Sequence, residues 1–195
     1  MSWKLCPKCG INYIDDNQVI CNVCANIIGQ TNNVIEKPII KHKEFNSFMV
    51  FQGKGYISAP YKDAGGKSPS HWTMLENVKP GDVIFHGLSQ CISAISVATS
   101  QCFTSTMKNG ITEVRRVNCS TILIKNTIAT SECLDVILET CPKYKYQPFD
   151  KNGNGRQGYL FDINDKLAGA FTRVLVQKNP DLLRKIPRLA IMMKY

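Results

Sequence analysis

The chain has 195 residues and a formal net charge of +9, which arises from 24 basic and 15 acidic residues. This length suits one medium-sized domain with a small additional module, and a hydrophobic content of 44% is ordinary for a globular protein. The charge excess favours a polyanionic partner, nucleic acid before a membrane surface, over a solvated basic surface without a partner. No apolar run reaches about eighteen residues and the first residues lack an apolar signal region, so we expect a cytoplasmic protein that neither spans nor binds a membrane.

The strongest local signal is a C-x2-C-x11-C-x2-C array formed by Cys6, Cys9, Cys21 and Cys24. Each C-x-x-C pair can present two thiolates from one tight turn, and two such turns supply the four sulfur ligands that structural zinc prefers. Because four sulfurs close the coordination shell, the metal is predicted to be structural and not catalytic. We therefore predict a zinc ribbon over residues 1–29 that binds Zn²⁺, with redox-active cysteine pairs or an iron–sulfur cluster as alternatives. The five other cysteines are expected to be reduced thiols.

Residues 30–45 are polar and end in a basic segment, which is typical of a linker. The main domain is predicted to occupy residues 46–177. It begins with an alternating strand pattern from Phe45 to Gln52, and glycines at 53 and 55 turn the chain into a second strand over residues 56–60.

The loop that follows is rich in glycine, serine and lysine, and contains Lys62 and Lys67. Its Gly-Gly-Lys-Ser string lacks the spacing of a phosphate-binding P-loop, so it is better suited to contact a sugar-phosphate backbone than to hydrolyse a nucleotide. His71 and Trp72 then open a short helical segment, and a Pro-Gly turn over residues 78–82 leads into two apolar runs over residues 83–85 and 91–98. We predict that these runs form a β-hairpin of a small, curved sheet.

These residues also resemble a known family. The pattern W-x-x-L-x-x-V-K-P-G-D-V-I-F-H from Trp72, followed by I-S-A-I-S-V-A-T-S from Ile92, is similar to EVE-type members of the PUA/YTH-like superfamily. The similarity is greatest to bacterial versions joined to HNH restriction nucleases, and it extends over about residues 46–177. It implies an α+β fold with a PUA-like curved β-barrel and flanking helices. It also implies a nucleic-acid reader that turns a base out into an aromatic pocket.

Carried over to this sequence, the resemblance implies a base pocket formed by Tyr56, Ser58, Trp72, Ser96 and Phe103, with a core position as the alternative for Trp72. Relatives often have a tryptophan near the position of Ser58, so the serine departs from the pattern and shifts the stacking role to the other aromatic residues. The contacts to the nucleic-acid backbone are expected from basic side chains around this pocket, namely Lys54, Lys62, Lys67, His71, Arg115, Lys151 and Arg156.

Residues 112–125 alternate well enough for a long strand, which would direct Arg115 and Arg116 to opposite faces. One of them is expected to contact phosphate and the other to be a rim charge. Residues 131–138 are predicted to form a helix with Ser131 as its N-cap, and a later helix is predicted to begin after the cap Asn164.

The segment Asp150 to Gly155 mimics the first half of an EF-hand calcium loop, but Phe161 stands where a bidentate glutamate is needed. We therefore interpret it as a polar loop that approaches nucleic acid. Residues 178–195 are predicted to be a basic helical tail, which either contacts a partner or is solvated.

No nucleophile, general base or HNH module can be assigned, so we do not expect an enzyme. The preferred interpretation is a reader of modified bases that is linked to restriction or defence, with methylated cytosine in DNA first and modified RNA second. The alternative is an adaptor whose zinc ribbon binds a separate nuclease or a transcription protein. A nucleic-acid reader should lose affinity steeply as salt rises, whereas an apolar protein contact should not.

Overall fold

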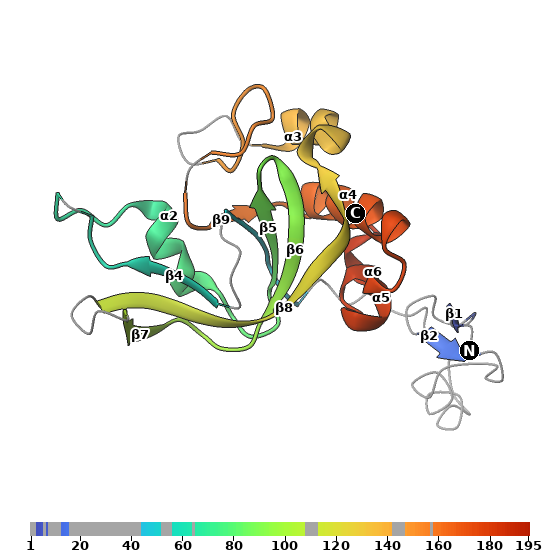
Figure 1. Cartoon of the computed structure of the whole chain (residues 1–195), viewed down its shortest axis with the longest axis horizontal. Helices are drawn as coiled ribbons and strands as arrows, with labels where there is room; N and C mark the ends of the chain where they lie inside the picture. Colours follow the sequence, from blue (N-terminus) through green and yellow to red (C-terminus); the bar gives the residue numbers. More distant parts are fainter. Residues whose placement is uncertain are drawn as a thin grey trace, which may run out of the picture.

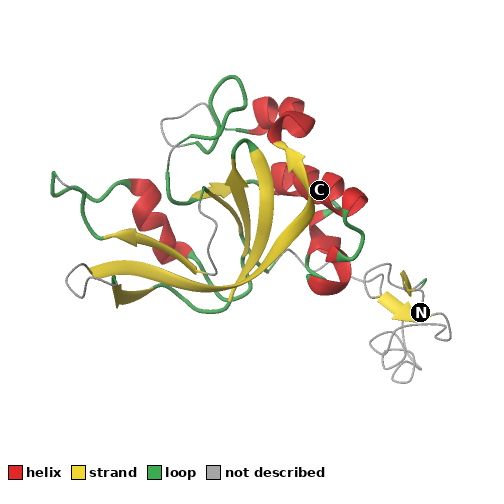
Figure 2. Cartoon of the chain, viewed as in Figure 1, coloured by secondary structure: helices red, strands yellow, loops and turns green. Residues whose placement is uncertain are grey.

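The computed structural model describes residues 3–5, 7, 13–15, 44–51, 56–63, 65–107, 113–141, 147–156 and 158–195. Within these residues the fold is mixed α+β: a curled sheet of half-barrel shape carries short helices at its sides (Figures 1 and 2). None of the helices among the described residues combines the length and apolar character that a membrane crossing requires.

The main sheet has the strand order β4-β8-β6-β5-β3-β9. Strand β7 pairs with the first part of β8, on the other side of that strand from β4. Only the β3–β5 pair is parallel among the described pairs of this sheet, and the others are antiparallel. The strands are β3 (Ser47–Val50), β4 (Tyr56–Pro60), β5 (Val83–Leu88), β6 (Cys91–Ala98), β7 (Phe103–Thr106), β8 (Glu113–Ala129) and β9 (Phe161–Ile163). The predicted hairpin is confirmed by the antiparallel pair β5–β6, and the predicted strand at residues 56–60 is confirmed by β4.

Strand β8 organises the sheet because it is shared between two groups of strands. Its first part, Glu113 to Asn118, pairs with β4 and β7, whereas the part from Cys119 onward pairs with β6. The register with β6 shifts between Ile92 and Ala94, which is the mark of a β-bulge. The strand is longer than the sequence predicted, and its two sets of partners give the sheet its curl.

The turn before β5 is fixed by a buried carboxylate. Gly81 has a φ of 97°, a conformation that favours glycine, and Asp82 is 1% exposed. The two carboxylate oxygens of Asp82 accept the backbone N–H groups of Asn46 at 2.7 Å and Lys79 at 2.8 Å. Asp82 therefore links the predicted Pro-Gly turn to the start of β3.

The helices are α2 (Ser70–Thr73), η1 (Met74–Asn77), η2 (Thr130–Cys133), α3 (Leu134–Thr140), α4 (Asp165–Lys178), α5 (Leu182–Lys185) and α6 (Leu189–Met192). The predicted cap of α4 is confirmed, because the Asn164 side chain accepts the N–H of Leu167 at 2.9 Å. The predicted cap at Ser131 is wrong. A 3₁₀ turn precedes α3, whose N-cap position is Cys133 and has no side-chain capping bond; Glu132 accepts the N–H of Ala129 at 2.9 Å at the start of the 3₁₀ turn.

Two hydrophobic clusters form the core. One lies between the sheet and α3–α6, and the other lies beneath α2 and η1. Residues 178–195 contribute to the first cluster, because apolar side chains of α5, of α6 and of the connection between them are buried there: Leu182, Leu183, Ile186, Leu189 and Met192. Packing continues past residue 177, and the basic side chains of the tail, Arg184, Lys185 and Lys194, are exposed. The tail is therefore an integral part of the main domain.

Near the N-terminus, β1 (Trp3–Leu5) pairs with β2 (Tyr13–Asp15) in antiparallel register. The first predicted cysteine pair, Cys6 and Cys9, falls in the connection between these strands. All four predicted zinc ligands lie outside the described residues, and so does the linker up to residue 43.

Candidate nucleic-acid interface

Three predicted pocket residues meet on one face of the sheet. Ser58 of β4 and Phe103 of β7 are both register partners of Arg116 on β8. Because side chains alternate along a strand, Tyr56 and Ser58 share their face of the sheet with Arg116 and Phe103. These four residues are partly or fully exposed, and we call them the open face. The strands that carry it lie at the end of the molecule away from α4–α6 (Figure 1).

Arg116 lies at the centre of the open face. Its guanidinium carbon lies 3.9 Å from the centroid of the Tyr56 ring, within the range of a cation–π interaction. The ring of Phe103, on the strand at the other side, is 39% exposed. The Nε atom of Arg116 is buried and has no hydrogen-bond partner among the described residues. The open face thus combines two aromatic rings with a charged donor that lacks an acceptor.

The opposite face of these strands is covered by α2 and η1, and Arg115 is buried beneath them. Arg115 is 7% exposed, and its Nε lies 2.5 Å from a carboxylate oxygen of Glu76. A terminal nitrogen donates to the carbonyl oxygens of Pro60 at 3.3 Å and Tyr61 at 3.2 Å. The predicted opposite orientation of the two arginines is confirmed. The expected phosphate contact does not fit Arg115, however, because its guanidinium is enclosed by these partners.

Trp72 lies on α2 and packs against the cluster that contains Ile57 and Val117, on the covered side of the strands. Its ring meets the Tyr159 ring edge to face, with the centroids 5.3 Å apart. Trp72 is partly buried, and the strands lie between it and the open face. The structure therefore does not bring Trp72 together with Tyr56 and Phe103 in one pocket.

Ser96 lies inside the sheet and is 0% exposed. Its hydroxyl oxygen is 2.6 Å from the Nε2 of buried His86 and 2.6 Å from the hydroxyl oxygen of Thr121. Both neighbours are within hydrogen-bond distance, and no surface of Ser96 is available to a base. Its position indicates a role in the interior of the fold.

The loop after β4 presents Lys62 and Lys67, both of them exposed. Asp63 closes this loop, because its carboxylate accepts the backbone N–H of Lys67 at 2.8 Å. The hydroxyl of Tyr61 lies 2.6 Å from that of Thr104, which joins the loop to β7. Thr104 is the register partner of Arg115, and the Arg115 guanidinium lies 4.2 Å from the centroid of the Tyr61 ring, so Tyr61 joins this loop to β7 on the covered face.

The loop at residues 150–156 carries exposed Lys151 and partly buried Arg156. Asp150 accepts the backbone N–H groups of Asn154 at 2.9 Å and Asn152 at 2.8 Å, and these bonds hold the pKa of its carboxyl below the usual range. The carboxylate that matches the first ligand of an EF-hand is thus used to close its own loop.

His71 stacks on the ring of Phe161, with the centroids 6.1 Å apart and the rings inclined by 22°. Burial lowers the pKa of His71 below its usual value, so the imidazole is mainly neutral at pH 7. It would therefore add little charge to a phosphate contact. Lys54, the remaining predicted contact, lies outside the described residues.

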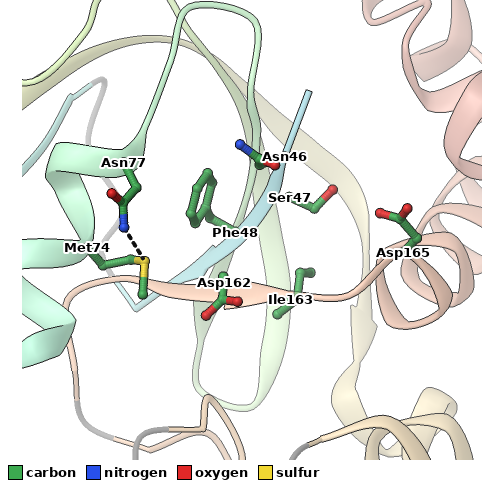
Figure 3. A pocket seen from close by; sticks show the side chains of 8 residues that line it. All are labelled: Asn46, Ser47, Phe48, Met74, Asn77, Asp162, Ile163 and Asp165. Carbon is green, nitrogen blue, oxygen red and sulfur yellow. Dashed lines mark hydrogen bonds between the residues drawn. The ribbon is translucent and has the colours of Figure 1, made fainter. Parts of the chain in front are cut away.

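A cavity of about 320 Å³ lies between β3, β9 and the short helix η1 (Figure 3). Two carboxylates, two carboxamides and a serine line it together with apolar side chains, in full Asn46, Ser47, Phe48, Met74, Asn77, Asp162, Ile163 and Asp165. Lysine, arginine and histidine are absent from this lining, and no predicted site residue belongs to it. Its chemistry suits hydrogen-bond donors better than phosphate.

Four cysteine thiols of the main domain are buried or partly buried. Burial raises the pKa values of Cys119, Cys133 and Cys141 to about 11, and it also raises the pKa of Cys102. At neutral pH these thiols are protonated and behave as small apolar groups, since the thiolate is the nucleophile. Among the described residues, no group of three or more histidine, cysteine or acidic side chains is arranged so that it could bind a metal ion.

Comparison of the sequence with models of known protein families and with curated proteins finds no match. The resemblance to EVE-type domains therefore rests on the sequence motifs, and support for a function comes from these motifs and from the geometry of the open face.

Proposed function

We propose that this chain is a non-catalytic nucleic-acid-binding protein that stacks bases on the open face of β4, β8 and β7. The observation that supports this proposal is the position of Arg116, which lies against the Tyr56 ring and is the register partner of exposed Phe103. Aromatic rings and guanidinium planes are the groups on which proteins stack unpaired bases.

The energies involved are adequate for such a function. Stacking on an aromatic ring contributes about 1–3 kcal/mol per base, which is comparable to the few kcal/mol needed to unstack a base. A buried donor without a partner costs about 1–3 kcal/mol. The Nε of Arg116 is shielded from solvent, so this cost belongs to the folded state, and a ligand would contact the partly exposed remainder of the side chain.

The finer identity of the ligand follows from the resemblance. A PUA-like domain of the EVE type would read a modified base, with methylated cytosine in DNA as the first choice and modified RNA as the second. Zn²⁺ would be held by Cys6, Cys9, Cys21 and Cys24 as a structural ion. A separate nuclease of a restriction or defence system would be the protein partner.

A binding titration tests the proposal. The chain would be titrated with matched single-stranded and duplex DNA and RNA, with and without cytosine or adenine methylation, at two salt concentrations. Arg116→Ala is expected to weaken binding at least tenfold, whereas Arg184→Ala, which removes an exposed arginine from α5, should change it less than twofold. Equal effects of the two variants, or no binding by the unmodified chain, would refute a specific role of the open face.

The adaptor function is the second candidate, and one observation favours it. Phe103, the register partner of Arg116, is 39% exposed, and Met107, directly after β7, is 48% exposed, so two apolar side chains of this segment are open to a partner. An apolar protein contact would resist salt, whereas nucleic-acid binding weakens steeply as salt rises. Absence of nucleic-acid binding at low salt, together with a salt-resistant complex with a nuclease, would favour the adaptor.

A further inference from the structure

We infer that the open face takes a single strand of nucleic acid in preference to a duplex, and that the loop at residues 61–69 holds its phosphates. This inference rests on the proposed function and deepens it by assigning the class of ligand. It is carried by the spacing of the aromatic rings, by the order of the loop and by the distribution of charge.

The positions of Tyr56 and Phe103 on the sheet favour bases that are not stacked on each other. Tyr56 and Phe103 lie on the two strands that flank β8, and their register partners on β8 are two residues apart. Strands about 4.8 Å apart and residues about 3.3 Å apart along a strand place the two Cα atoms roughly 12 Å from each other. Bases of one strand in a duplex are separated by only about 3.4 Å, and their faces are covered by their neighbours. A base can therefore stack on either ring only when one of its faces is uncovered, as in an unpaired strand.

The loop that follows β4 carries two lysines and is held by its own hydrogen bonds. Its bonds from Asp63 to the Lys67 amide and from Tyr61 to Thr104 hold its shape without a ligand. Lys62 follows Ser58, the register partner of Arg116, by four residues, which is at most about 13 Å of chain. A strand whose bases lie on the open face therefore passes within reach of Lys62, and the backbone of Lys67 is bonded to Asp63, the residue next to Lys62.

Charge on this side of the molecule complements a polyanion. The acidic side chains of the described parts of β4, β7, the first part of β8 and the loop are Asp63 and Glu113. The carboxylate of Asp63 accepts amides of its own loop, and Glu113 has the strand parity of Arg115 on the covered face. Arg116, Lys62 and Lys67 thus leave the open face and its loop with a positive balance.

The experiment uses the full chain and three probes of about 12 nucleotides or base pairs: a mixed-sequence single-stranded DNA, its RNA counterpart and the matching DNA duplex. A single strand is expected to bind at least tenfold more tightly than the duplex. Each phosphate contact to a single strand contributes roughly 0.7 to the slope of log affinity against log salt. Lys62→Ser and Lys67→Ser should each reduce this slope by about that amount. Lys125→Ser, an exposed lysine in the later part of β8, is the matched control and should leave it unchanged.

The outcomes separate this inference from the proposed function. Duplex binding as tight as single-strand binding, with both still sensitive to Arg116→Ala, would overturn the strand preference and leave nucleic-acid binding intact. Unchanged salt slopes in both loop variants would overturn the phosphate role of the loop. Failure of all three probes to bind at low salt would overturn the proposed function itself.

Discussion

Arg115 and Arg116 are neighbours in the chain, yet their replacement by alanine should have opposite consequences. Arg115→Ala is expected to destabilise the fold by about 2–3 kcal/mol with nucleic-acid binding retained by the folded fraction. Arg116→Ala is expected to change stability by less than about 1 kcal/mol and to weaken binding. The pair therefore tests whether the two faces of β8 are correctly assigned.

The magnitude for Arg115 follows from its partners. Truncation leaves the carbonyl oxygens of Pro60 and Tyr61 without their charged donor, and hydrogen bonds to charged groups contribute about 1.5–3 kcal/mol each at good geometry. Their lengths of 3.2–3.3 Å place them at the lower end of this range. The side chain of Glu76 is 55% exposed, so solvent compensates for most of the lost ion pair and we add little for it.

Urea unfolding followed by circular dichroism measures the difference directly. A loss of about 2–3 kcal/mol would also lower the melting temperature by roughly 4–12 °C for a chain of this size. Glu76→Ala is a useful intermediate case, because Arg115 would keep its bonds to the carbonyls and the loss should remain below about 1 kcal/mol. A free energy of unfolding for Arg115→Ala within about 0.5 kcal/mol of the unmodified chain would refute this reasoning, as would equal destabilisation by Arg116→Ala.

Three further predictions concern the metal, the pH dependence and the interior. Metal analysis is expected to find about one zinc ion per chain, and Cys21→Ser should lose most of it while Cys133→Ser, in the buried core, keeps it; retention by Cys21→Ser would exclude the proposed site. Because burial lowers the pKa of His71, the unfolded chain takes up its proton at a higher pH than the folded chain. Its contribution to stability is complete above about pH 6.5 and decreases as the pH falls from there toward the lower folded-state pKa. His71→Gln should flatten this part of the stability profile, and an unchanged profile would contradict the assignment. Ser96→Ala removes the hydroxyl between His86 and Thr121, and it should lower the free energy of unfolding in urea by about 1–3 kcal/mol. Binding of nucleic acid by the folded protein should be unchanged. A loss of binding without a loss of stability would show that Ser96 contacts the base.

Local patterns in the sequence predicted the local parts of the fold. Alternation and turn residues located β4 and the β5–β6 hairpin, and the cap Asn164 fixed the start of α4. Errors arose where distant contacts decide the structure. Ser131 has the chemistry of a cap, but the chain forms a 3₁₀ turn there and α3 begins only after Cys133, without a side-chain cap. The tail at residues 178–195 was interpreted from its charge, whereas its apolar residues join the main core.

The candidate site was predictable only in part for the same reason. Aromatic residues such as Tyr56 and Phe103 could be selected by type, but the pairing of β4 and β7 on either side of β8 is not encoded in any short segment. Trp72 and Ser96 belong to the predicted base pocket because the family pattern places them near a base. In this chain Trp72 packs against the Tyr159 ring on the covered side of the strands. Ser96 lies in the interior, within hydrogen-bond distance of the His86 imidazole.

The two arginines contain a signal that could have identified the open face from the sequence. Val117 and Cys119 share the strand parity of Arg115, whereas Val114 and Asn118 share that of Arg116, so the two sets differ in apolar character only after Arg116. The more apolar set belongs to the covered face, which leaves Arg116 outside and requires Arg115 to find partners within the fold. It finds them at the end of β4 and on η1, and this ordered structure holds the strand on which Tyr56 lies. The buried arginine thus supports the surface on which the exposed one acts, so Arg115→Lys, which keeps the charge but loses the forked geometry, should weaken binding only to the extent that it loosens β4.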